Sequence, residues 1–282
     1  MMKTIPQAEI DRRVYEMAKT YLPSLQIAGV TAALVEKYLQ PLTVAQRPES
    51  KADIYCRILE SAQNANMKAG VVGGSIDGGV RALGKVLFDF NAAKVLEIYH
   101  DNWKLVLRHI VKDLNPRGEI RRKPRSIWPH YCQTILSGAS FVEQFTSHQE
   151  FYRWVEFFDK DDRARASLPL LISQEIDGFG FPLACDFLKE LGYVNFPKAD
   201  VHLRAIFVGL ALCPKSPSDY ELFKAIIRVA KNAGVTPYNA DKVFWLIGSG
   251  KFDNHPEVGK NGKIGRHKVA FIKYARSQLI RS

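Results

Sequence analysis

The chain has 282 residues, of which 46% are hydrophobic, which is enough to bury a core and excludes a disordered protein. Forty Lys and Arg residues against 29 Asp and Glu residues give a formal net charge of +11, which favours an anionic partner, nucleic acid before an anionic membrane. No run reaches the roughly 18 apolar residues of a membrane span, and none has the pattern of a signal peptide. We therefore expect a cytoplasmic protein without a membrane partner.

The four cysteines are widely scattered: Cys56, Cys132, Cys185 and Cys213. No two of them form a Cys-x-x-Cys pair, and none lies near a histidine at the spacing of zinc ligands. We expect reduced thiols, no metal site and no cofactor.

Apolar residues recur three and four positions apart along most of the chain, and strict alternation is rare, which predicts helices. In chain order the predicted helices cover residues 14–21, 32–39, 54–62, 92–111, 141–158, 163–176, 183–191, 201–212, 220–233, 240–247 and 267–280. Start signals support several of them, such as Ser218 with Glu221 three residues later. The predicted fold class is all-α.

Three stretches interrupt this periodicity. Residues 71–79 contain four glycines, but no predicted strand precedes them and no Gly-Lys-Ser/Thr comes after them. A flexible loop between helices is therefore favoured over a phosphate-binding loop. The other two stretches are residues 115–129, which are rich in basic side chains, and residues 251–265, which are rich in Gly, Asn and Lys.

The basic side chains of these stretches are candidate DNA contacts. The candidates in the first stretch are Arg121, Arg122, Lys123 and Arg125, with Glu119 as the single acid there. Near the end of the chain, residues 259–282 contain seven Lys or Arg residues and no Asp or Glu. Such runs also occur as ordinary solvated faces, so their meaning depends on an independent signal for DNA.

That signal is a glycine turn between two predicted helices, Ile176-Asp177-Gly178-Phe179-Gly180. Two glycines one residue apart permit positive φ values and let the N–H groups at the start of the next helix approach a phosphate oxygen. Ile176 and Phe179 can anchor the turn in the core. A Gly-x-Gly alone is also common in ordinary turns between helices, so its meaning depends on the residues that come after it.

An acid comes after this turn at a defined place. The next helix ends at Gly192, and a loop with Pro197 leads to Asp200, directly before another apolar helix. An Asp in this position is a typical helix N-cap, and a catalytic role is compatible with capping.

This order resembles the helix-hairpin-helix DNA glycosylase family. The turn at 176–180 matches the hairpin, Ala184 lies in the second hairpin helix, and Phe196-Pro197-Lys198-Ala199-Asp200-Val201-His202-Leu203-Arg204 resembles the family's Pro-x-x-Asp-x-His-Val-x-Arg pattern. The resemblance implies a two-lobed helical bundle that acts in base excision repair on double-stranded DNA with a damaged or modified base. The base would be flipped out, and Asp200 would stabilise the sugar cation or activate water while the N-glycosidic bond is hydrolysed.

Two departures from the family pattern bear on the chemistry. Bifunctional members carry a Lys two positions after the second hairpin glycine, where this chain has Pro182. Nothing after Cys213 could supply the four-cysteine iron–sulfur loop of some members. We therefore predict a monofunctional glycosylase. The alternatives are a bifunctional glycosylase-lyase that uses Lys198, and a non-catalytic structure-specific DNA-binding protein.

The remaining site residues are expected to bind or position the DNA. Gly178, Phe179 and Gly180 would contact the DNA backbone, and Arg204 would contact phosphate or brace its helix. Candidates for the base pocket or wedge are Trp128, Tyr131 and Phe181, because they lie beside the basic stretch or the hairpin.

We expect a monomer with three regions. They are an N-terminal helical region at 1–125, a glycosylase-like core at 126–250, and a basic loop and helix at 251–282 that packs back on the N-terminal lobe.

Overall fold

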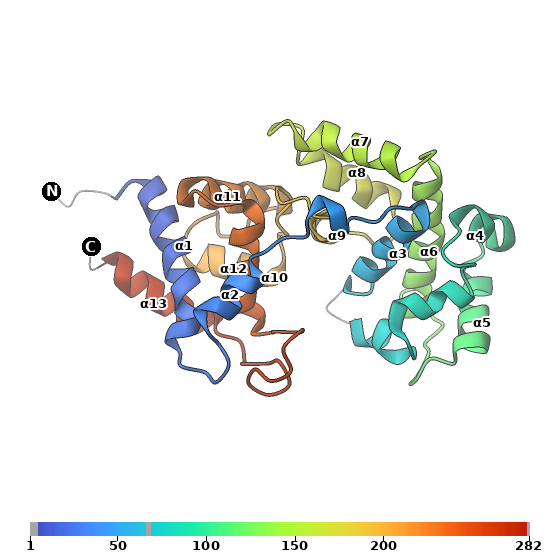
Figure 1. Cartoon of the computed structure of the whole chain (residues 1–282), viewed down its shortest axis with the longest axis horizontal. Coiled ribbons are helices and arrows are strands. Elements are labelled where there is room, and N and C mark those ends of the chain that lie inside the picture. Colours follow the sequence, from blue (N-terminus) through green and yellow to red (C-terminus); the bar gives the residue numbers. More distant parts are fainter. Residues whose placement is uncertain (1–4, 66–68, 281–282) are drawn as a thin grey trace. The chain divides into compact units, whose positions relative to one another are not determined.

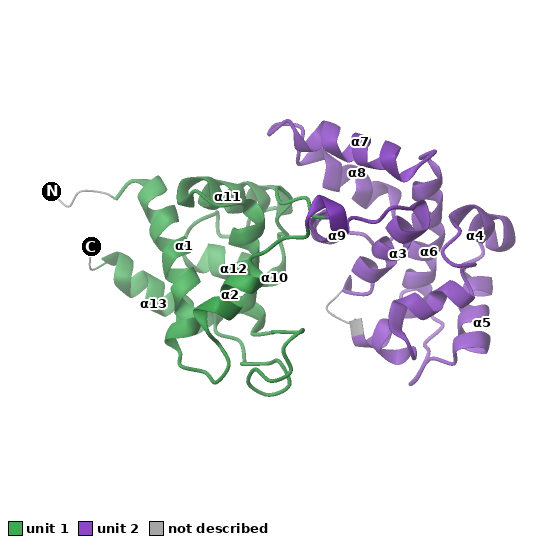
Figure 2. Ribbon diagram, in the orientation of Figure 1, with its two compact units in different colours: residues 1–42, 192–282 green, residues 43–191 purple. Residues whose placement is uncertain are grey.

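The computed structural model describes residues 5–65 and 69–280, and within these ranges its regular elements are helices, with no strand (Figure 1). The predicted all-α fold is confirmed. The chain forms two compact units: residues 1–42 and 192–282 make unit 1, and residues 43–191 make unit 2 (Figure 2).

Unit 1 is built from the N-terminal and C-terminal parts of the chain. Its helices are α1 (Gln7–Ser24), α2 (Ala32–Tyr38), α10 (Val201–Gly209), α11 (Asp219–Ala233), α12 (Pro237–Ser249) and α13 (Lys268–Ile280). Their apolar faces share one core, in which the ring of Phe244 lies 5.2 Å from that of Phe207 and 6.2 Å from that of Phe271. The ring centre of Tyr21 on α1 lies 5.1 Å from that of Phe271 on α13, so the last helix packs on the first.

A buried acid also ties the two ends together. Asp11 on α1 is fully buried and accepts hydrogen bonds from Arg228 (2.8 Å) and Asn232 (2.7 Å) on α11. Gln7 donates a further hydrogen bond to it at 2.8 Å. A buried carboxylate is costly unless it is paired in this way, so this cluster specifies how α1 packs on α11.

Unit 2 is built around α6 (Ile127–Glu143), which packs against α3 (Lys51–Ala62), α4 (Ala92–Tyr99) and α5 (Trp103–Leu114). Its other helices are α7 (His148–Asp159), α8 (Ser167–Glu175) and α9 (Phe181–Glu190). Two buried tyrosine hydroxyls hold α3 on α6: Tyr55 donates to the carbonyl of Ile135 (2.7 Å) and Tyr131 donates to that of Leu59 (3.0 Å).

The two units differ from the predicted regions, whose boundaries fell at residues 125 and 250. Apolar periodicity marks helices, but it does not tell which helices pack together. The packing of α1 on α11 brings residues about 200 positions apart into one core, and this pairing has no signature in the local sequence.

Helix boundaries differ from the prediction at two breaks. The stretch 92–111 forms α4 and α5, because His100 takes a positive φ of 49° and the Asn102 side chain caps α5. The stretch 141–158 is divided by Ser147, which caps α7. Helix α6 begins at residue 127, inside a stretch predicted to be irregular, and Pro129 is tolerated because it falls in the first turn.

Candidate functional site

The α8–α9 turn, residues 176–180, contains one residue with a positive φ. Gly178 has a φ of +76°, which favours glycine, and the N–H of Phe179 donates to the carbonyl of Ile176 at 3.0 Å. Gly180 has φ −77° and ψ 164°, an extended backbone that any residue can adopt, and it is the N-cap of α9. Of the two glycines that permit a positive φ, only Gly178 adopts one.

Helix α6 holds this turn in place within unit 2. The Thr134 hydroxyl donates to the carbonyl of Asp177 (2.6 Å), and the N–H of Asp177 donates to the Ser137 hydroxyl (2.9 Å). Ile176 and Phe179 are buried beneath the turn, as expected for anchors. The turn is thus a fixed feature of the surface, tied to α6 by side-chain hydrogen bonds.

The turn leaves two backbone donors open. Gly178 and Gly180 are exposed, and within the described part of the chain their N–H groups have no hydrogen-bond acceptor. Such groups at a helix start are suited to a phosphate oxygen. The expected DNA contact of Phe179 is not supported, because its side chain is 2% exposed and its N–H is already used inside the turn.

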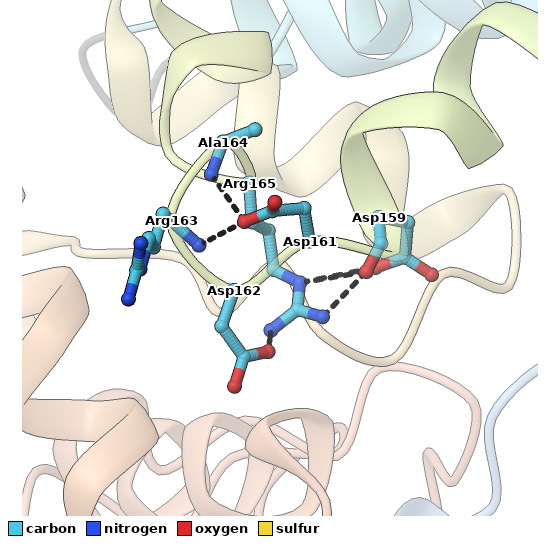
Figure 3. Close-up of polar contacts among 6 residues, drawn as sticks. All are labelled: Asp159, Asp161, Asp162, Arg163, Ala164 and Arg165. Atoms are coloured by element: carbon cyan, nitrogen blue, oxygen red, sulfur yellow. Dashed lines mark hydrogen bonds and ion pairs between the residues drawn. The ribbon is translucent and has the colours of Figure 1, made fainter.

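A dense set of polar contacts fixes the chain before α8 (Figure 3). Arg165 is 8% exposed and donates to the carbonyl of Asp159 and to the carboxylate of Asp162 (2.6 Å). The Asp161 carboxylate accepts from the N–H of Arg163 (2.6 Å) and of Ala164 (3.1 Å), and these hydrogen bonds lower its pKa. This cluster defines where α8 begins and so supports the turn at the other end of that helix.

In unit 1, Asp200 is the N-cap of α10, as the sequence predicts. Its Oδ1 accepts hydrogen bonds from the N–H groups of His202 (2.8 Å) and Leu203 (3.0 Å). Among the described residues no donor is bonded to its Oδ2. One carboxylate oxygen thus holds the start of the helix, and the other takes no part in the cap.

The surroundings of Asp200 raise its pKa. Burial is the main cause, and the charge of Asp241 adds to it, although the N–H of Leu203 and the charges of Lys198 and His202 oppose the shift. Asp241 is fully buried on α12, and its Oδ2 accepts a hydrogen bond from the N–H of Lys198 at 2.9 Å. No sequence pattern singles out Asp241, which belongs to a helix about 40 residues further along the chain.

His202 packs behind Asp200 and lies directly against Gly248 of α12. A Cβ added to Gly248 would come within 2.6 Å of the His202 Cβ, so only glycine leaves room for the ring. Burial lowers the pKa of His202, and the nearby charges of Lys268, Arg266 and Lys251 lower it further against the opposing effect of Asp200. His202 therefore packs against α12, and the causes of its lowered pKa include three cations near the start of α10.

Those cations belong to a structured loop, residues 250–267, and to the start of the helix after it. The N–H of Ile264 donates to the carbonyl of Gly250 (2.9 Å), and the N–H of His267 donates to that of Ile247 (3.0 Å), which holds the loop on the end of α12. A Cβ on Gly250 would stand 1.7 Å from the Gly265 carbonyl oxygen, so the two ends of the loop meet at backbone contact. Lys251 and Arg266 are exposed and Lys268 is partly exposed, and they belong to the stretch 251–265 and the basic run 259–282, in which no individual DNA contact was predicted.

Arg204 braces its helix. Its guanidinium donates to the carbonyl of Pro217 and to the carboxylate of Asp219 (2.5 Å), which ties α10 to the start of α11. Of the two roles expected for Arg204, the brace is therefore the one with contacts to support it.

Two of the aromatic candidates do not have the exposure that a wedge or pocket wall needs. Trp128 is 2% exposed and Tyr131 is 4% exposed, because both lie in α6 and face the core of unit 2. Phe181 is partly exposed in the first turn of α9. All four basic candidates in the 115–129 stretch are exposed, and Arg121 pairs with Glu119 at 3.3 Å.

Across the described residues, no helix combines the length and apolarity that crossing a membrane requires. The same residues contain no group of three or more His, Cys, Asp or Glu side chains arranged to hold a metal ion.

No protein-family model matches the sequence, and no curated protein matches it either. Among solved structures, the chain resembles the 8-oxoguanine glycosylase/lyase of Methanocaldococcus jannaschii, determined in complex with a 15-mer DNA that contains 8-oxoguanine. The TM-score is 0.50 and the sequence identity is 15%, and the match covers 82% of this chain and 96% of that chain. At this identity the likeness concerns the fold alone, which in this chain is all-α.

Proposed function

We propose that this protein is a DNA glycosylase that flips a damaged or modified base out of duplex DNA and hydrolyses its N-glycosidic bond. The observation that carries the proposal is the Asp200 carboxylate, which caps α10 through Oδ1 and keeps Oδ2 open. Earlier in the chain lies a turn with two open backbone donors. The solved structure with a similar fold is itself a DNA glycosylase/lyase, which adds support.

Asp200 would act on the sugar of the extruded nucleotide. As the bond between C1′ and the base nitrogen breaks, positive charge builds on the deoxyribose, and an ionised carboxylate stabilises that charge. Water then adds to C1′ and gives up a proton, for which the same carboxylate is a suitable acceptor. The products are a free base, which gains a proton, and an abasic site in an intact strand.

DNA would be held mainly through its phosphates. The N–H groups of Gly178 and Gly180 are suited to one phosphate, and the exposed cations Lys251 and Arg266 lie on the loop that hydrogen bonds hold on the end of α12. These contacts carry no sequence information, so they suit an enzyme that must scan many sequences for one altered base. We propose that it works as a monomer on double-stranded DNA.

Water is the proposed nucleophile because of Pro182. The family's lyase members use a Lys at the matching position, and a proline supplies no amine. A second candidate, a glycosylase-lyase that uses Lys198, is favoured by one observation: the similar structure is a glycosylase/lyase. Borohydride reduction during the reaction separates the two, since a lysine imine would be trapped as a covalent protein–DNA adduct and hydrolysis would leave none.

The direct experiment measures release of free base from duplexes that each contain one altered base, beginning with 8-oxoguanine and including oxidised and alkylated purines. The proposal expects release from at least one duplex and none from the unmodified duplex. Binding without release across the whole panel would instead support a non-catalytic DNA-binding protein.

A further inference from the structure

Two surface hollows of unit 2 are lined in part by the basic segment (residues 117–126) that joins α5 to α6. The first has a volume of about 240 Å³ and is lined by Trp103, Lys104, Leu107, Arg108 and Arg122. The second, of about 460 Å³, is lined by Val71, Glu119, Arg121, Arg125, Ser126, Ile127 and Trp128. Both hollows thus contain arginine side chains, and the first also has a partly exposed tryptophan, whereas Trp128 at the second is 2% exposed.

The basic segment is a fixed ridge that contributes to both hollows. At its start, the N–H of Arg117 donates to the carbonyl of Ser75 (2.9 Å), and the Arg117 guanidinium donates to that of Gly74 (3.1 Å). At its end, the N–H of Ser126 donates to the carbonyl of Lys123 (2.8 Å), directly before α6. The consecutive residues Arg121 and Arg122 have no regular secondary structure and line different hollows, as alternate side chains of an extended backbone do.

The first hollow is built from one face of α5. Trp103 is partly exposed and Leu107, one turn later, is 4% exposed, so together they supply an apolar wall and floor. Lys104 and Arg108 form another pair one turn apart on the exposed surface, and the Lys104 ammonium lies 5.7 Å from the centre of the Trp103 ring. The hollow lies at the start of α5, where the helix dipole adds positive potential.

The charge in this hollow is of one sign. Lys104, Arg108 and Arg122 line it, no acid does, and no carboxylate of the described residues lies within ion-pair distance of these three cations. A cationic rim alone is suited to any polyanion. A partly exposed tryptophan over an apolar floor also favours a ligand with a flat ring, because such a ring can stack on the indole.

We propose that the first hollow, the Trp103 hollow, binds a nucleotide of single-stranded DNA, with its base on the Trp103 ring and its phosphates on Arg122, Arg108 and Lys104. A base inside a duplex is stacked on both faces and cannot reach the ring, so the ligand is an unpaired strand. The ridge of Arg121 and Arg122 leads the strand on toward the second hollow. This site does not depend on Asp200 or on base release, and it would direct the protein to DNA with single-stranded segments.

The test measures fluorescence anisotropy of labelled ten-nucleotide strands with the full chain carrying Asp200→Asn, so that no chemistry occurs. One strand is oligothymidylate and the other has the same sugar–phosphate backbone with abasic spacers. Stacking predicts that thymidylate binds more tightly than the abasic strand, by about five-fold or more, from the usual strength of base–aromatic stacking. Equal binding of the two strands would overturn the proposal.

Variants localise the effect. Trp103→Leu is expected to bring thymidylate binding down to the level of the abasic strand, whereas Trp103→Phe, which keeps a ring, stays within about three-fold of the parent. Arg122→Ala is expected to weaken the binding of both strands. It should also reduce the magnitude of the slope of log affinity against log salt concentration by about 0.7. Arg163→Ala removes an exposed cation of unit 2 that lines neither hollow, and it should change nothing.

Two results would contradict the assignment. One is that Trp103→Leu binds the thymidylate strand as tightly as the parent protein does. The other is full competition by polyglutamate, which would make the hollow a site for acidic protein segments. The base-release experiment is independent of these readouts, because loss of release by Asp200→Asn concerns unit 1, whereas Trp103 lies in unit 2.

Discussion

The Asp241 carboxylate accepts a hydrogen bond from the N–H of Lys198 at 2.9 Å, and its charge contributes to the raised pKa of Asp200 two residues later. Asp241 therefore does two things for the start of α10. It fixes the backbone that leads into Asp200, and it adjusts the pH at which Asp200 becomes ionised.

This pairing predicts a pH dependence of base release. An ionised Asp200 is required, so activity falls as the pH drops through its pKa, which burial and Asp241 place above that of an ordinary aspartate. Asp241→Asn keeps an oxygen that can accept from Lys198 and removes the charge, so the acidic limb of the profile should move to lower pH. Single-turnover rates of both proteins across the acidic range measure this. An acidic limb that does not move would contradict the role given to Asp241.

The same raised pKa has a consequence for stability. A carboxyl group whose pKa is higher in the folded state binds its proton more tightly there, so its contribution to stability falls as the pH rises through the interval between the unfolded and folded values. At neutral pH the ionised Asp200 is therefore unfavourable. Asp200→Asn, which can still cap α10, should unfold at an equal or higher temperature at pH 7, with a smaller difference at acidic pH.

Asp200→Ala serves as the comparison, because it removes the cap together with the charge. Loss of the cap alone costs about 1 kcal/mol. Chemical denaturation of the two variants at pH 7 should rank Asn above Ala. A large loss of stability in Asp200→Asn would show that the carboxylate has a mainly structural role.

The two glycines of the α8–α9 turn should respond differently to alanine. In Gly178→Ala, the positive φ costs about 1–2 kcal/mol, and the new Cβ would lie 3.0 Å from the Thr134 hydroxyl. In Gly180→Ala, the backbone is extended and the nearest contact is an ordinary 3.7 Å to Pro182, so the cost stays below about 1 kcal/mol.

Affinity for duplex DNA is the second property to measure in the Gly178 and Gly180 variants, after stability. A methyl group beside the Gly180 N–H hinders a phosphate, and losing a hydrogen bond to a charged group reduces affinity by about ten-fold or more. Urea unfolding and anisotropy with a labelled duplex measure both effects. If Gly180→Ala is stable and binds the duplex as the parent does, this N–H does not contact phosphate.

A further pair of glycines tests the loop at 250–267. Gly234 and Gly250 come directly after α11 and α12 with similar φ values of 69° and 65°. An added Cβ meets nothing within 4 Å at Gly234, whereas at Gly250 it would meet the Gly265 carbonyl oxygen. Gly234→Ala should cost about 1 kcal/mol from backbone strain alone, and Gly250→Ala more than about 3 kcal/mol. Equal unfolding free energies for the two variants would contradict the close loop contact.

Local features of the site were predictable from the sequence. The turn at Gly178 and the cap at Asp200 each depend on a few consecutive residues whose conformational preferences are strong. The helical class is predicted in the same way from apolar spacing.

Features that depend on packing between distant segments were not predictable. Trp128 and Tyr131 were expected to be available for a base because they lie beside the basic stretch, yet α6 begins at residue 127 and turns both rings inward. Asp241 and Arg266 come close to α10 only through the packing of α12 and of the loop after it. No local pattern marks such contacts.

The central claim is tested most directly by comparing free-base release by the parent protein and by Asp200→Asn on the same altered duplex under single-turnover conditions. We predict release by the parent and a loss of at least about 100-fold in the variant, with duplex affinity and folding retained. Release by Asp200→Asn at the rate of the parent would contradict the assignment of Asp200 as the catalytic carboxylate.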